Sequence, residues 1–197
     1  MINRRLPVAL LCAMTAAALS ACASLSGAPD APAVERQYVS VINSLSWTNA
    51  LSGKRDGLRT SWPLDSLQGH KETFPLAQIK QCSKAGNDDE TCAWGVMRAQ
   101  RNVSKVSQVP GGISLDLSLG IEIERSARVR EPGFDVAMTM PADVPALRWS
   151  GGLKRNFMLV FGEVQHVDLA HGISYDVCAL RYDAGGRALD VCAIPYF

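Results

Sequence analysis

The clearest feature of the chain is a strict alternation of apolar and polar side chains over residues 113–124. Successive side chains of a β-strand point to opposite faces, so a period of two predicts one buried and one solvated face. The apolar positions are Ile113, Leu115, Leu117, Leu119, Ile121 and Ile123. We therefore expect a long strand here, packed against a core on one side.

Shorter apolar-rich segments, separated by turn residues, predict further strands. Clusters of glycine and proline at 110–112, 132–133 and 151–152 separate several of them. Short strands with regular turn signals are typical of an antiparallel β-sandwich or a small barrel-like domain, so the fold class is expected to be mainly β. The additional strands are expected at residues 74–81, 93–101, 134–140, 156–161, 164–169, 174–183 and 187–194.

One N-terminal helix is expected before these strands. Asp30 suits its N-cap, Pro32 its first turn and Gly53 its end. Residues 54–70 are then expected to form a loop that contains Pro63 and Gly69. The residues that would share one face of the helix are Val34, Tyr38, Val41, Ile42 and Leu45.

The first 22 residues have the organisation of an export signal. Arg4 and Arg5 make a basic start, an apolar stretch follows over residues 6–19, and Leu19-Ser20-Ala21-Cys22 closes the segment. This order resembles the signal of bacterial lipoproteins, whose lipobox ends in a cysteine. The resemblance covers residues 1–22 only, and it implies that Cys22 becomes the lipidated first residue.

The resemblance also implies a location in the cell and a set of boundaries between the parts of the chain. In the family, an aspartate after the cysteine favours retention in the inner membrane; Ala23 therefore favours the periplasmic face of the outer membrane. Two or more acyl chains hold a protein stably at a membrane. The expected parts are a signal peptide at 1–21, a lipidated tether at 22–30 and a single mainly-β periplasmic domain at 31–197. Ordinary secretion is the alternative, because residues 21–23 also fit a small-x-small cleavage site.

Four cysteines remain after the signal: Cys82, Cys92, Cys178 and Cys192. An even number in an exported chain suggests disulfides, and four cysteines allow three pairings. A hairpin of 174–183 and 187–194 would place Cys178 opposite Cys192. Cys82 and Cys92 flank a polar loop in the same way, so two hairpin disulfides are expected. Buried free thiols or a zinc site are the alternatives, although neither spacing is the close pair that zinc usually requires.

Composition narrows the classes of function. A content of 47% hydrophobic and 20% charged residues excludes a wholly disordered chain, and a net charge of +1 lacks the basic footprint of a nucleic-acid binder. Without Arg4 and Arg5 the net charge becomes −1, so we expect membrane attachment through lipid rather than through charge. Motifs for a cofactor or a redox pair are not found, and we expect no cofactor.

Several polar clusters are candidates for chemistry. Glu163, His166, Asp168 and His171 are close in sequence and all are metal-ligand types, but a solvated strand and its following turn explain them equally well. We therefore expect no metal site.

Acidic and basic residues at the end of the alternating segment have a similar ordinary explanation. Glu122 and Glu124 share a strand face and would suit acid–base chemistry, yet acidic residues are common on a wet face. Arg125, Arg128 and Arg130 follow, and we interpret them as a solvated edge that discourages sheet pairing.

The function expected from these observations is that of a non-enzymatic, membrane-anchored component of the cell envelope that binds another envelope protein. An inhibitor or immunity lipoprotein directed against a hydrolytic toxin or a lysozyme-like enzyme is the main alternative. A periplasmic hydrolase that uses Glu122 and Glu124, or the region of His166, is a third hypothesis.

Overall fold

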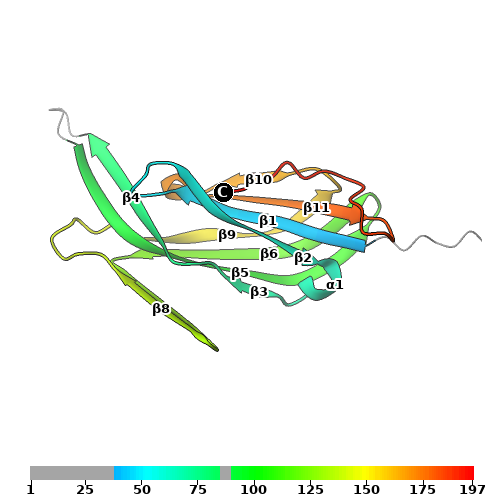
Figure 1. The fold of residues 1–197 in the computed structure, drawn as a ribbon, viewed down its shortest axis with the longest axis horizontal. Helices are drawn as coiled ribbons and strands as arrows, with labels where there is room; N and C mark the ends of the chain where they lie inside the picture. Colours follow the sequence, from blue (N-terminus) through cyan, green and yellow to red (C-terminus); the bar gives the residue numbers. More distant parts are fainter. Residues whose placement is uncertain (1–37, 85–89) are drawn as a thin grey trace, which may run out of the picture. The chain divides into compact units, whose positions relative to one another are not determined.

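A computed structural model describes residues 38–84 and 90–197, which form antiparallel sheets (Figure 1). The strands are β1 (Tyr38–Thr48), β2 (Arg55–Pro63), β3 (Lys71–Thr73), β4 (Ala77–Lys84), β5 (Glu90–Val109), β6 (Gly112–Glu124), β7 (Ser126–Glu131), β8 (Phe134–Thr139), β9 (Trp149–Val160), β10 (Gln165–Asp168) and β11 (Ser174–Tyr182). A short helix α1 (Leu64–Leu67) and a 3₁₀ turn η1 (Ala170–Gly172) complete the described elements. The expected mainly-β class is confirmed.

The strands are distributed over two main sheets and one ribbon. The first sheet has the order β10-β11-β1-β2, and the second has the order β3-β5-β6-β9, with β4 also paired to β5. Strands β7 and β8 pair only with each other in a two-stranded ribbon, and Figure 1 shows β8 diverging from the second sheet. The two main sheets share one hydrophobic core.

The alternating segment forms β6, the central strand of the second sheet, as predicted. Its odd-numbered side chains are at most 2% exposed, and they face core residues of the first sheet such as Leu45 and Tyr175. The even-numbered side chains point to the outer face of the second sheet. This division of β6 decides which side chains are available for binding on that face.

The prediction of an N-terminal helix is wrong over residues 38–48, which form β1. The strand pairs with β11 on one side and with β2 on the other. Val41 and Leu45 point into the main core, while Ile42 points to the opposite face and is also buried. A strand buried on both faces has a continuous apolar sequence, which mimics helical spacing. Residues 31–37 of the expected helix, the signal peptide, the tether and Cys22 lie outside the described residues.

The loop expected at 54–70 is also wrong, because it contains β2 and α1. Strand β2 is an edge strand with few apolar residues, and mainly Leu58 and Trp62 pack against the core. An edge strand of this kind gives a weak period-two signal.

Both expected disulfides are confirmed. Cys82 lies directly opposite Cys92 in the β4–β5 register, and the Cα atoms are 4.0 Å apart. Cys178 is joined to Cys192 with a Cα–Cα distance of 6.0 Å. The left-handed turn expected at Gly186 is present, with φ +79°.

The second strand of the expected C-terminal hairpin is not formed. Both edges of β11 are already occupied, by β1 along its whole length and by β10 along its first half. The returning chain therefore bonds to β11 only near Arg181 and Tyr182 and then crosses the outer face of the first sheet. There Cys192 and Ile194 pack against Ile42, Cys178 and Leu180 in a second small core.

Candidate functional site

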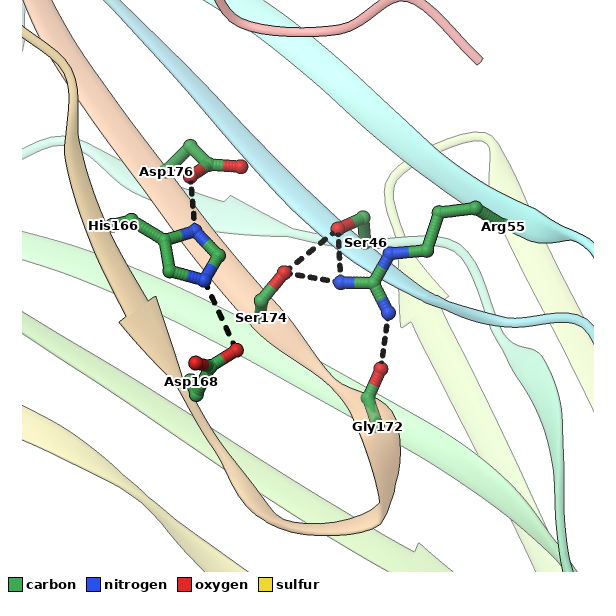
Figure 2. A network of polar contacts seen from close by, with 7 residues as sticks. All are labelled: Ser46, Arg55, His166, Asp168, Gly172, Ser174 and Asp176. Atoms are coloured by element: carbon green, nitrogen blue, oxygen red, sulfur yellow. Dashed lines mark hydrogen bonds and ion pairs between the residues drawn. The ribbon is translucent and has the colours of Figure 1, made fainter.

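Two of the residues that the sequence suggested for chemistry, His166 and Asp168, lie in a polar corner between β10 and β11 (Figure 2). We call it the β10–β11 corner, and it lies on the outer face of the first sheet. His166 on β10 lies directly opposite Asp176 on β11. Its Nδ1 atom lies 2.6 Å from Asp176 Oδ1, and its Nε2 atom lies 3.0 Å from Asp168 Oδ1. The imidazole is thus held between two carboxylates.

These two carboxylates favour the protonated ring. The hydrogen bond to Asp176 and, second, that to Asp168 raise the pKa of His166 above 6.5, although partial burial opposes the shift. Both ring nitrogens then act as donors. Each ring nitrogen is engaged by a carboxylate, so His166 has no free nitrogen that could act as a base.

Two serines and an arginine form the neighbouring part of the corner. The hydroxyl groups of Ser46 and Ser174 lie 3.0 Å apart. The Arg55 guanidinium donates to both hydroxyls and to the carbonyl oxygen of Gly172 in turn η1. Because Ser174 bonds to Ser46 and Arg55 and is not hydrogen-bonded to His166, the corner lacks the serine–histidine contact of an activated nucleophile. Its contacts tie β2 to the turn before β11.

The structure does not bring the four suggested metal ligands together. His171 lies in turn η1 with φ 59°, where its Nδ1 atom contacts Gln81 Oε1 and its ring packs edge-on against Trp149 at 5.4 Å. His171 thus faces β4 and β9, whereas His166 faces β11. Glu163 lies in the turn before β10, outside the contacts of both rings in the described chain.

One group of potential metal ligands was found in the described ranges: Cys82, Glu90 and Cys92. Its two sulfur atoms are bonded to each other in the first disulfide. They are therefore not thiolates available to a cation.

The acidic side chains of β6 lie on the outer face of the second sheet, but they are engaged separately. Glu122 forms an ion pair with Arg98, which lies directly opposite it on β5. Asp116 accepts a hydrogen bond from Asn156 at 2.8 Å. Neighbouring strands thus supply a cation for Glu122 and an amide for Asp116.

A cleft of about 700 Å³ lies on this same outer face, beside the β7–β8 ribbon. We call it the hairpin cleft. One wall consists of four successive residues of β7, Arg128 to Glu131, and the floor is formed by polar and small residues of the second sheet. The floor residues include Thr73, Gln100, Asn102, Ser118, Gly120 and Ser150.

Arg128 and Arg130 were expected to form a solvated edge, and the cleft beside them was not predicted from the sequence. Both arginines pair with Asp135 on β8, with nitrogen–oxygen distances of 2.5 and 3.3 Å. Arg128 and, less strongly, Arg130 hold the pKa of Asp135 below its usual value. The alternation of Arg128 and Arg130 with the apolar residues Ala127 and Val129, followed by Pro132 and Gly133, was the available signal for a hairpin.

A buried charged cluster between the two sheets was also not predicted. Arg101 on β5 lies opposite Glu72 on β3, and their side chains are 0% and 9% exposed. Nη2 of Arg101 lies 3.1 Å from the Glu72 carboxylate and 3.3 Å from Nδ1 of His70. Burial raises the pKa of the adjacent Tyr175 to about 12. This cluster lies in the core, where it cannot contact a large partner.

Comparisons with known proteins do not assign the chain to a class. No protein-family model, curated protein or solved structure matches it. Within residues 38–84 and 90–197, no helix combines the length and the apolar character needed to cross a bilayer.

Proposed function

We propose that this chain is a membrane-anchored periplasmic lipoprotein of the outer membrane, attached through lipid on Cys22, and that it binds another envelope protein. The observation that carries the binding role is the hairpin cleft, which is open beside an exposed ribbon. Together they offer a concave polar surface and a projecting strand pair, which suit the capture of a segment from another protein.

The exposed ribbon adds apolar contact area to this surface. Phe134 is 49% exposed and Val136 is 37% exposed, and both occupy even positions of β8, so they share one face. Apolar side chains grouped on a projecting element, with charged residues beside them, favour contact with a partner. Phe134 and Val136 are therefore expected to contribute to binding.

Two further features support the proposed location. Both disulfides fit an oxidising compartment such as the periplasm, where such bonds form and persist. The eight residues of the proposed tether, 23–30, would allow a reach of about 15 Å, so the domain would work close to the membrane surface. A partner in the envelope suits both features.

The arrangement of the β10–β11 corner favours a binding role over hydrolysis. His166 uses one nitrogen for Asp176 and the other for Asp168, and the nearby Ser174 bonds to Arg55. Glu122 is similarly paired with Arg98. These polar groups stabilise strands and turns, so the proposal gives them no part in catalysis.

The test is photo-cross-linking in intact cells that produce the full chain. The cross-linking residue p-benzoylphenylalanine replaces Gln100 on the cleft floor or, as a matched control, Ser107 on the same strand outside the cleft. We expect one envelope protein to be captured reproducibly from position 100 and not from position 107. Equal capture from both positions, or capture from neither, would overturn the proposed function.

A further inference from the structure

The wall of the hairpin cleft is the backbone of a strand with one unpaired side. Strand β7 pairs with β8, and residues 126–131 make no other backbone–backbone hydrogen bond within the described chain. Side chains of successive strand residues point to opposite faces, so four consecutive residues line one cleft only if the strand presents its edge. The cleft is therefore lined by free backbone donors and acceptors.

The register identifies the residues whose backbone groups are free. The N–H group of Met140 donates to the carbonyl oxygen of Arg125, which marks this pair as hydrogen-bonded. Hydrogen-bonded and non-hydrogen-bonded pairs alternate along an antiparallel ladder. The backbone groups of Arg128 and Arg130 consequently point away from β8, toward the open edge.

The side chains around this edge are predominantly basic. Lys71, Arg98, Arg128 and Arg130 line the cleft, against the two acidic residues Glu122 and Glu131. The paired arginines are about half exposed or more, and exposed ion pairs contribute only about 0–1 kcal/mol. Carboxylates of a partner can therefore compete for these cations with Glu122 and Asp135.

Resting on the proposed function, we infer that the hairpin cleft binds an extended, acidic peptide segment of the envelope partner, which adds to β7 as a third strand. Backbone hydrogen bonds to Arg128 and Arg130 supply affinity, and carboxylates that meet the basic side chains supply selectivity. A free strand edge matches the backbone period of a peptide, whereas a glycan has no such repeat of donors and acceptors. The four cleft-lining residues of β7 span about 13 Å, which suits a segment of four to six residues.

The test uses the full-length mature lipoprotein in detergent and a fluorescent peptide that alternates glutamate and valine. We expect saturable binding that weakens with added salt, because the charges are exposed. The same peptide with glutamine in place of glutamate should bind about tenfold more weakly, as should the acidic peptide with the Arg128→Gln/Arg130→Gln variant. Arg187→Gln, at an exposed arginine outside the cleft, is the matched control and should leave binding unchanged.

A second measurement addresses the strand edge itself. N-methylation of alternate residues on one edge of the peptide removes its backbone donors and should abolish saturable binding. In a separate measurement, hydrogen exchange at the amides of Arg128 and Arg130 should slow when the unmodified peptide is bound. Equal binding of the acidic and amide peptides, binding that survives N-methylation on either edge, or tighter binding of an oligogalacturonate glycan would each overturn the inference.

The result also separates this inference from the proposed function. If position 100 captures a partner but the protein does not prefer the acidic peptide, the inference of an acidic third strand is wrong and the proposed function stands. Selective binding of the peptide without capture of any envelope protein overturns the proposed function, while the cleft keeps its ligand class.

Discussion

The buried pair of Arg101 and Glu72 provides the sharpest test of how charge is balanced in the core of the protein. Replacing Glu72 by glutamine preserves the shape of the side chain and removes the negative charge that lies 3.1 Å from the guanidinium. Arg101 is then a fully buried cation without its carboxylate partner. Leaving one member of a buried ion pair uncompensated costs about 3–5 kcal/mol.

The expected loss is large enough to measure by chemical denaturation of the disulfide-bonded protein. A change of 1 kcal/mol lowers the melting temperature by roughly 2–4 °C in a domain of this size, so Glu72→Gln should lower it by about 6–20 °C. The midpoint of unfolding in guanidinium chloride should fall without a change in the slope of the transition.

Strand β5 supplies a matched control in the exposed pair of Arg98 and Glu122, whose side chains are 48% and 52% exposed. Glu122→Gln should cost less than about 1 kcal/mol. The double variant Glu72→Leu/Arg101→Met should recover most of the loss, since it removes both buried charges. If Glu72→Gln costs no more than Glu122→Gln, water reaches the pair and the reasoning is refuted.

Three other perturbations have defined outcomes. Asp176→Asn removes the main cause of the raised pKa of His166, so the pKa of this ring, measured by NMR titration, should move toward 6.5. In the unchanged protein, the stability that the protonated ring contributes is present below pH 6.5 and is lost as the pH rises through the raised pKa. A pKa that does not move in the variant would contradict this. Replacing Cys178 and Cys192 by alanine should lower the free energy of unfolding by about 2–4 kcal/mol and make residues 187–197 accessible to limited proteolysis. An unchanged midpoint of unfolding in guanidinium chloride would contradict the stabilising role of the disulfide. Gly57→Ala places a Cβ atom 2.7 Å from the backbone carbonyl oxygen of Leu45 and 2.8 Å from the ring of Phe197, so we expect a loss of about 1–3 kcal/mol by denaturation. A neutral effect would show that β1 and the C-terminal ring do not pack this closely on β2.

The sequence predicted those parts of the fold in which one face of a strand is wet. Strand β6 shows clean alternation because its even positions face solvent or the hairpin cleft. The disulfide of Cys82 and Cys92 was also predictable, since local pairing across a loop follows from the spacing of the cysteines. In both cases the determining interaction is local in sequence or repeats with a fixed period.

Elements buried on both faces could not be read in the same way. Strand β1 buries Val41 in the main core and Ile42 under the C-terminal segment, so its apolar residues follow no period of two. The prediction of a strand at residues 187–194 was wrong for a related reason. The sequence does not show that β1 and β10 occupy both edges of β11.

The candidate sites were predicted in part. Proximity in sequence correctly grouped His166 with Asp168, but Asp176 and Ser46 join them only through strand pairing. The hairpin cleft depends on the position of β7 beside the outer face of the second sheet, and this long-range arrangement leaves no local pattern. The isolated charge of Arg101 within a strand was a usable signal, because a charged residue at an inward position requires a partner.

The central claim is that this β domain works in the envelope from a lipid anchor on Cys22, and mass spectrometry of the N-terminal peptide from its native membranes tests it most directly. We expect a mature chain that begins at Cys22 and carries glyceride-linked acyl chains on the sulfur. A mature chain that begins at Ser24 without any lipid would contradict it.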